Sequence, residues 1–75
     1  MDKSKLEWKP ISGSSQIKAV YWNPIKKILY VRFPNRKEYS YEDVSEEEYK
    51  ELITADSIGS YFHSYIKTEK KWQSI

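Results

Sequence analysis

The amino-acid sequence predicts an α+β fold: a three-stranded antiparallel β-meander followed by two helices packed on one face of the sheet. Three observations support this prediction. Runs rich in β-branched and aromatic residues, typical of strands, are separated by short turns in the first half of the chain. A capping-box sequence then marks a helix start, and apolar residues recur twice at helical spacing. The order β-β-β-α-α places helices over one face of an antiparallel sheet.

The predicted strands are separated by short polar turns. Asn23-Pro24 interrupts the chain after the first strand, and the turn PNRK after the second contains Asn35, the residue there best suited to a left-handed conformation. Short turns favour antiparallel pairing of successive strands. The three predicted strands are Ser15–Trp22, Ile28–Phe33 and Glu38–Glu42.

Two helices are predicted in the second half. Ser45 can cap the first helix, because Glu48 follows three residues later as a capping box requires, and this helix is expected to end near Ala55. Asp56 or Ser57 can cap the second helix. In an alternative, ADSIGS is a loop and the second helix begins at residue 60. The apolar stripe of the second helix is Ile58, Phe62, Tyr65 and Ile66.

Length and composition indicate one small domain. The chain has 75 residues and no cysteine, so its core must come from aliphatic residues and from its three Trp, seven Tyr and two Phe. We expect residues 1–13 to be a flexible N-terminal arm, residues 14–67 the domain and residues 68–75 a C-terminal tail that extends the helix and frays. No apolar run suits a signal peptide or a membrane span, so a soluble cytoplasmic protein is expected.

The net charge of +2 is distributed unevenly along the chain. Residues 1–41 contain nine Lys or Arg and three Asp or Glu, whereas residues 42–66 contain one Lys and seven acidic residues. A basic half beside an acidic half indicates a polarised surface, although ordinary charge balance is the simpler interpretation.

The alternation of side chains across each strand predicts which residues face the helices. Leu29, Val31 and Phe33 form the apolar side of the second strand, and Tyr39 and Tyr41 are expected to point to the same layer. In the first strand, Lys18 makes Ile17, Ala19 and Tyr21 the expected core set. The predicted open face is therefore Lys18, Val20, Trp22, Ile28, Tyr30, Arg32, Glu38, Ser40 and Glu42.

This open face is a candidate surface for nucleic acid. Aromatic rings on an uncovered sheet can stack on unpaired bases, and nearby cations can neutralise phosphates. Alternatively, the face is an ordinary solvated surface, with Glu38 and Glu42 paired to cations across strands. The candidate nucleic-acid-binding residues are Lys18, Trp22, Lys26, Lys27, Tyr30, Arg32, Arg36 and Lys37.

Four segments together resemble the KTSC domain, a small family named for its occurrence at the C-terminus of some lysyl-tRNA synthetases and also found alone in bacteria and phages. They are SSQIKAVYWN, LYVRF, YSYEDV and ADSIGSYFHSYIK, which lie within residues 11–67. The chain differs from the usual pattern at Ser45, at His63 and at the Asn35-Arg36 turn. The resemblance implies RNA binding only by analogy with the synthetases. The positions matching the family motif are Ser14, Ser15, Tyr39, Tyr41, Ser57, Gly59, Tyr61 and Phe62.

The residue inventory argues against catalysis. The single histidine, His63, has no carboxylate three or four residues away on its helix, and a lone histidine cannot build a His/Cys metal site. No cofactor or metal is expected. The leading hypothesis is a non-catalytic module that binds RNA or single-stranded nucleic acid. The alternative is a protein-interaction module, such as a phage or prophage accessory acting on a host protein, with the acidic helix or an edge strand as its contact. A third hypothesis is a scaffold that self-associates through sheet edges.

Overall fold

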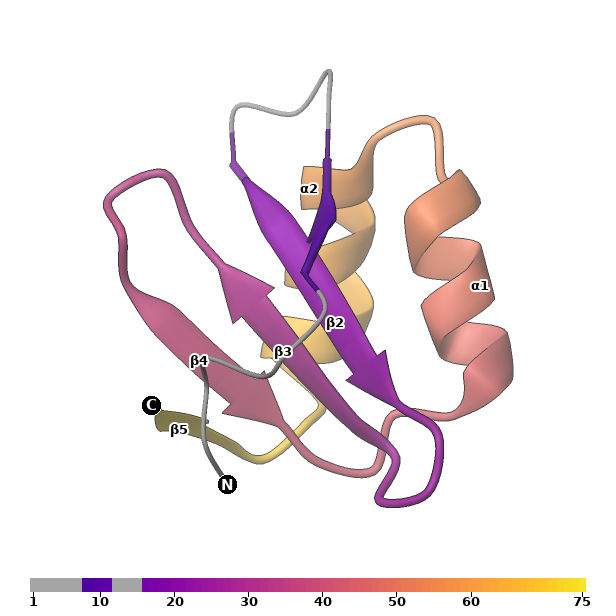
Figure 1. Ribbon diagram of the computed structural model, residues 1–75. Coiled ribbons are helices and arrows are strands. Elements are labelled where there is room, and N and C mark those ends of the chain that lie inside the picture. Colours follow the sequence, from indigo (N-terminus) through magenta and orange to yellow (C-terminus); the bar gives the residue numbers. More distant parts are fainter. Residues whose placement is uncertain (1–7, 12–15) are drawn as a thin grey trace.

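Five antiparallel strands form one sheet in the order β1-β2-β3-β4-β5, and the helices cover one of its faces (Figure 1). The computed structural model describes residues 8–11 and 16–75. The helices are α1 (Glu46–Thr54) and α2 (Ile58–Tyr61), and α2 continues directly into a π-helix, η2 (Phe62–Lys67). The strands are β1 (Lys9–Pro10), β2 (Ala19–Asn23), β3 (Ile28–Arg32), β4 (Glu38–Tyr41) and β5 (Trp72–Ser74).

The α+β class and the central antiparallel meander are confirmed, but two edge strands were not predicted. β1 pairs with β2, so part of the expected N-terminal arm joins the sheet. The C-terminal segment does not extend the helix. It turns back after η2 and pairs with β4, with Trp72 opposite Tyr41. The Trp72 ring meets the Tyr39 ring edge-on at 5.4 Å, and this contact with the neighbouring strand supports the pairing.

The β2–β3 and β3–β4 turns are each closed by an asparagine side chain. Asn23 Oδ1 accepts hydrogen bonds from the backbone of Ile25 and of Lys26, at 2.9 and 3.1 Å. Asn35 Oδ1 accepts from Lys37 at 3.0 Å. The prediction that Asn35 takes the left-handed conformation is wrong, because Arg36 does so, with φ of 70°. Asn35 instead uses its side chain to mimic a backbone turn.

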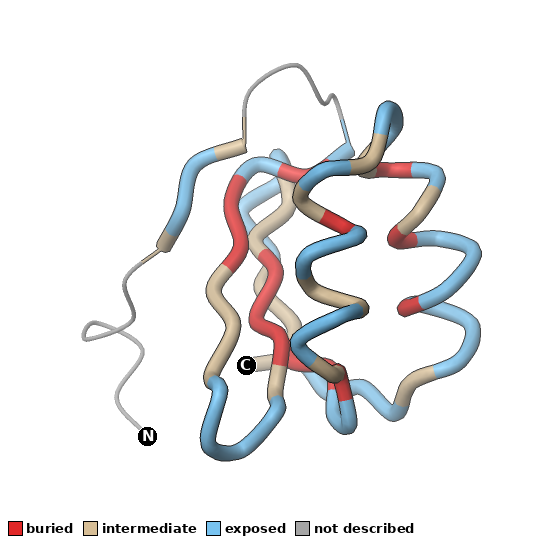
Figure 2. The backbone as a smooth tube through the Cα atoms, turned by 90° about the vertical axis from the view of Figure 1, so that its right-hand side faces the viewer, coloured by how far each residue is buried: buried red, intermediate tan, exposed pale blue. Residues whose placement is uncertain are grey.

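The core lies between the sheet and the helices, where the buried positions of both layers gather (Figure 2). The prediction that Tyr39 and Tyr41 face the helices is confirmed. Tyr41 is 3% exposed within the core, and Tyr39 is half-buried and packs against the core. The residues with no exposed surface are Ile17, Val20, Leu29, Val31, Val44, Leu52 and Ile66.

The predicted cap of each helix is present. The Ser45 hydroxyl accepts from the Glu48 backbone at 3.1 Å, and Glu48 Oε1 accepts from the Ser45 backbone at 3.0 Å, which completes the capping box. Ser57 caps α2 by accepting from the Ser60 backbone, so the alternative in which the second helix begins at residue 60 is wrong.

Glu48 also connects the start of α1 to the segment that follows η2. Lys70, which follows η2, donates to Glu48 Oε1 at 2.9 Å and to the Asp43 carbonyl at 2.8 Å. Partial burial acts to raise the Glu48 pKa, but the bonds from Ser45 and Lys70 outweigh it, so the pKa lies below its usual value of 4.5.

In the Glu48→Gln variant, the free energy of unfolding is expected to fall less than in the parent protein as the pH is lowered. Because the folded-state pKa of Glu48 is depressed, its contribution is complete above the unfolded pKa and is lost as the pH falls through the folded pKa. Urea-denaturation midpoints are measured from neutral pH down to about pH 3, and the slope is the change of the midpoint with pH. The control is Glu47→Gln, an exposed neighbour in the same helical turn. Equal slopes for the Glu48 variant and the parent protein contradict this account.

Candidate nucleic-acid interface on the open face of the sheet

Cross-strand pairing identifies the residues on the face of the sheet away from the helices, here called the open face. Tyr21 lies opposite Tyr30, and Tyr30 lies opposite Ser40 on the next strand. Paired residues share a face, so the alternation along each strand assigns the rest. Among the described strand residues, the open face consists of Pro10, Ala19, Tyr21, Asn23, Ile28, Tyr30, Arg32, Glu38, Ser40 and Gln73.

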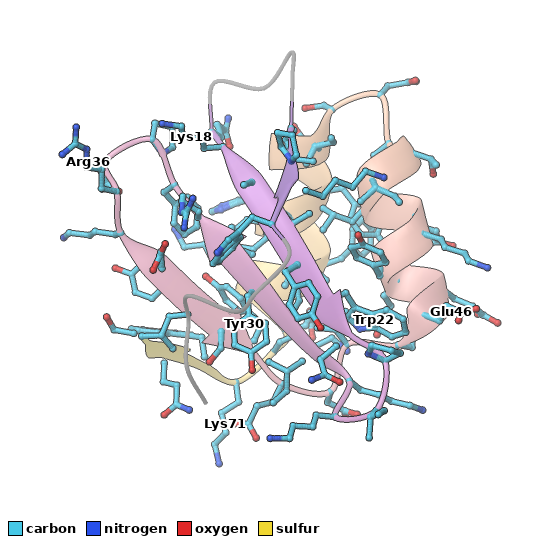
Figure 3. All side chains as sticks on the ribbon, viewed as in Figure 1. Lys18, Trp22, Tyr30, Arg36, Glu46 and Lys71 are labelled. Atoms are coloured by element: carbon cyan, nitrogen blue, oxygen red, sulfur yellow. The ribbon has the colours of Figure 1, made fainter. Side chains whose placement is uncertain are left out.

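Trp22 is not on the open face, and its predicted role as a stacking platform is wrong. Its indole nitrogen donates to the Val44 carbonyl at 2.8 Å. Its ring lies nearly parallel to the Tyr49 ring of α1, with 5.3 Å between centroids. The indole therefore lies between the sheet and α1, as Figure 3 also shows, and holds the helical layer to the sheet.

Trp22 was assigned to the wrong face because the first strand was predicted to begin too early. Regular pairing of β2 with β3 begins at Ala19, whereas the prediction extended the alternation back to residue 15. Ile17 and Val20 both belong to the core, although they are three residues apart. A strict alternation cannot place both residues on one face. Counting the alternation from the polar Lys18 therefore assigned the residues of β2 to the wrong faces of the sheet.

Tyr21 and Tyr30 form a stacked pair on the open face. Their ring centroids are 5.8 Å apart with 29° between the ring planes. Tyr30 faces away from the helices, as predicted, but it is only 7% exposed, so it cannot present its ring to a ligand. Burial, followed by the neighbouring Tyr21, raises the pKa of Tyr30. Tyr21 is half-buried and rests on Tyr30, which makes it the accessible ring of the pair.

Arg32 of β3 contacts a residue of β4 and the tryptophan that precedes β1. Its Nε donates to Glu38 Oε2 at 2.6 Å, and its guanidinium carbon lies 4.4 Å from the centroid of the Trp8 ring. Such a cation–π contact holds the indole against the sheet. The solvated-face interpretation predicted that Glu38 would pair with a cation across strands, and Arg32 is that cation. Arg32 therefore stabilises the surface of the sheet through this ion pair.

The predicted turn cations do not surround one spot. Lys26 and Lys27 lie in the β2–β3 turn, whereas Arg36 and Lys37 lie in the β3–β4 turn at the opposite end of the sheet (Figure 1). A five-residue strand spans about 17 Å, so the two groups bracket the open face. Lys18, which is exposed at the start of β2, lies at the same end as Arg36 (Figure 3).

Sequence reasoning missed three residues of this region: Trp8, Tyr21 and Lys71. Trp8 was assigned to the arm, and its place depends on the β1–β2 pairing. Tyr21 was assigned to the core by the incorrect parity. Lys71 precedes β5, and its carbonyl accepts from the Glu42 backbone at 2.9 Å, which places this lysine beside the end of β4. A local sequence signal could have found only Tyr21, through the alternative parity.

The positions that match the family motif have structural roles where they are described; Ser14 and Ser15 lie outside the described residues. Phe62 is 4% exposed in the core. Gly59 is buried, and a β-carbon there would lie 2.6 Å from Gln16 Oε1, so this glycine permits close packing. The Tyr61 hydroxyl donates to Glu51 at 2.7 Å, and burial followed by that carboxylate raises its pKa to about 12.

The single histidine lies in η2. His63 is exposed and lines a shallow hollow with Gln16, Gly59, Ser60 and Ser64. Among the described residues, no group of three or more His, Cys, Asp or Glu side chains comes together as a metal site. Within the same residues, no helix has the length and apolar character needed to cross a bilayer.

A family model and a solved structure identify the family of this chain, and two further relatives resemble it in sequence. The model of the KTSC domain matches residues 13–69. An uncharacterized protein of Stutzerimonas stutzeri is 34% identical over 56 residues, covering 75% of this chain and 79% of the relative. A protein of Tsukamurella paurometabola is 33% identical over 54 residues, covering 72% and 81%. The crystal structure of a KTSC domain protein from Yersinia pestis superimposes with a TM-score of 0.87 at 27% identity, covering 93% of this chain and 97% of that one. The chain therefore belongs to the KTSC domain family.

Proposed function

We propose that this domain is a non-catalytic module that binds single-stranded RNA through the open face of its sheet. The observation that carries the proposal is the Tyr21–Tyr30 pair, an aromatic stack on the face that no helix covers. The buried Tyr30 ring stacks against Tyr21, and this contact restricts the orientation of the accessible ring. A rigid, partly exposed ring can stack on an unpaired base without being ordered first.

Charge supports the same face. Exposed cations stand at both ends of the sheet, with Lys18 and Arg36 at one end and Lys26 at the other. The acids of α1, among them Glu46, lie in the helical layer away from this face (Figure 3). A strand running along the open face would place its phosphates near cations and avoid the acidic helix.

Tyr21→Ala is expected to weaken binding of a fluorescein-labelled oligouridine of about a dozen nucleotides by about tenfold or more, because one base loses its stacking partner. Fluorescence anisotropy measures the dissociation constant. Tyr21→Phe retains the ring and should bind like the parent protein. The matched control is Tyr65→Ala, which removes a tyrosine that is 56% exposed on the helical layer.

The salt dependence of the RNA affinity tests whether the cations of the open face contact phosphates. Three phosphate contacts give a slope of about −2 in log affinity against log salt for a single strand. Lys18→Glu and Lys26→Glu should each reduce affinity and slope, whereas Lys50→Glu, at an exposed lysine of α1 paired with Glu46 at 3.2 Å, should not. Equal losses for Tyr21→Ala and Tyr65→Ala, or equal effects of all three lysine reversals, rule out the open face as the site.

A second candidate function is binding of a basic protein surface through α1, which exposes Glu46, Glu47 and Glu51 on one helix. Affinity capture from bacterial lysate with and without ribonuclease separates the two candidates. RNA recovered by the parent protein and lost with Tyr21→Ala supports the proposed function. A protein that survives ribonuclease treatment and is lost with Glu47→Lys supports the second candidate instead.

A further inference from the structure

A separate pocket lies on the helical side of the sheet, between β4, β5 and η2. Its volume is about 230 Å³. A cavity of about 150 Å³ is enough to hold benzene, so this pocket has room for a substituted aromatic ring. It contains the two tyrosines of the family motif, which the proposed function does not use. The lining residues are Phe33, Tyr39, Tyr41, Lys67 and Trp72.

The walls of the pocket are aromatic rings set at steep angles to one another. Tyr39 meets Phe33 at 5.5 Å and Trp72 at 5.4 Å, with 69° and 83° between the ring planes. Trp72 is 56% exposed, an unusual exposure for an indole. Edge-on packing leaves ring faces that are not stacked on each other, so a planar ligand can lie against Tyr39 and Trp72.

The polar groups of the pocket are suited to an anion. Lys67, the last residue of η2, is exposed and makes no ion pair or side-chain hydrogen bond with the described residues. Among the described residues, no acidic side chain lines the pocket. A tyrosine hydroxyl is protonated at neutral pH and can donate a hydrogen bond, and burial, followed by Tyr39, raises the pKa of Tyr41 further, to about 12.

The Tyr41 hydroxyl is positioned to donate a hydrogen bond into the pocket. It makes no hydrogen bond with the described residues, although the residue is only 3% exposed. No fully buried side-chain nitrogen or oxygen in the described part lacks a partner, so this hydroxyl must reach solvent. The opening available to it is the pocket that Tyr41 lines. Lys67 and Tyr41 thus supply a cation and a neutral donor in an aromatic enclosure.

We propose that this pocket binds a planar aromatic ring carrying one anionic group, with the ring against Tyr39 and Trp72 and the anion at the Lys67 ammonium. This site goes beyond the proposed function, because it lies on the opposite face of the sheet from Tyr21. An aromatic carboxylate and a nucleoside monophosphate share the required chemistry. The aromatic enclosure selects the ring and the lysine selects the charge.

Indole N–H signals in ¹H–¹⁵N spectra of the full chain can test this site, because the three tryptophans report on three regions. Trp72 lines the pocket, Trp22 lies in the core, and Trp8 lies beside the open face. Tryptophan-to-phenylalanine variants assign the signals. Benzoate and AMP are expected to shift only the Trp72 signal, with affinity on the order of millimolar for so small a ligand. Benzamide and adenosine, which lack the anion, should bind about tenfold more weakly.

Lys67→Met keeps the aliphatic stem of this exposed side chain and should weaken benzoate and AMP binding about tenfold. Lys71→Met, at an exposed lysine outside the pocket lining, is the matched control and should leave both affinities unchanged. A response to either anionic probe alone supports the site and identifies the source of its ligand.

Three results overturn the site: equal affinity for charged and neutral rings, no effect of Lys67→Met, or a shift at Trp8 in place of Trp72. The proposed function is tested independently, because oligouridine should move the Trp8 signal and respond to Tyr21→Ala. Either site can therefore fail without the other.

Discussion

Trp22→Ala is expected to lower the free energy of unfolding by about 3–5 kcal/mol, which is close to the whole stability of a domain this small. The variant loses the stacking contact with Tyr49 and the hydrogen bond to the Val44 carbonyl. It also leaves a cavity between the sheet and α1. Urea denaturation followed by far-ultraviolet circular dichroism measures the loss without relying on tryptophan emission.

The adjacent residue provides the control, because it lies on the opposite face of the same strand. Tyr21→Ala loses the contact with Tyr30 and should cost only about 1 kcal/mol. Trp22→Phe keeps a ring but removes the indole N–H, so its stability should fall between those of the parent and Trp22→Ala. A Tyr21→Ala variant less stable than Trp22→Ala contradicts the assignment of faces in β2.

Phe62→Ala is expected to destabilise the protein by a similar amount, about 3–5 kcal/mol. Phe62 is 4% exposed at the first position of η2. Its ring meets Tyr41 at 5.1 Å and Phe33 at 5.7 Å, both edge-on, so it connects the π-helix to β4 and to the residue that follows β3. Removing it leaves a cavity that three different elements would have to close together.

Tyr65→Ala serves as the matched control for Phe62→Ala, because it removes an aromatic ring three residues further along η2. Tyr65 is 56% exposed and contacts Tyr61 at 4.7 Å. Its loss should cost less than about 1 kcal/mol. Thermal unfolding should show a large drop in Tm for Phe62→Ala and a shift of a few degrees for Tyr65→Ala. Comparable shifts for the two variants would show that η2 does not pack as described.

Local signals in the sequence were reliable where the structure depends on neighbouring residues. The capping box at Ser45 was predicted and is confirmed, and Ser57, one of the two residues offered as a cap for the second helix, is the cap. Each depends on contacts within a few residues. The core positions of Tyr41 and Phe62 followed from strand and helix periodicity, which long, regular patterns specify well.

The candidate site was predicted less well, because its composition depends on strand parity and edge pairing. Trp22 and Tyr21 exchange faces if the alternation is counted from Lys18 in place of Ala19, and nothing local to residues 18–22 decides between the two registers. Trp8 joins the open face only through β1. The cations of the two turns lie at opposite ends of the sheet, because successive turns of a meander alternate between its two ends.

By itself the sequence determined the fold class, the central meander, the start of the first helix and much of the core, because alternation, helical spacing and capping are short-range properties of the chain. Only the tertiary structure decided which aromatic rings lie outside, that Trp72–Ser74 completes the sheet, and that Tyr39, Tyr41 and Lys67 share a pocket. These outcomes depend on contacts between residues about 20 or more positions apart, and such contacts form when whole elements pack together.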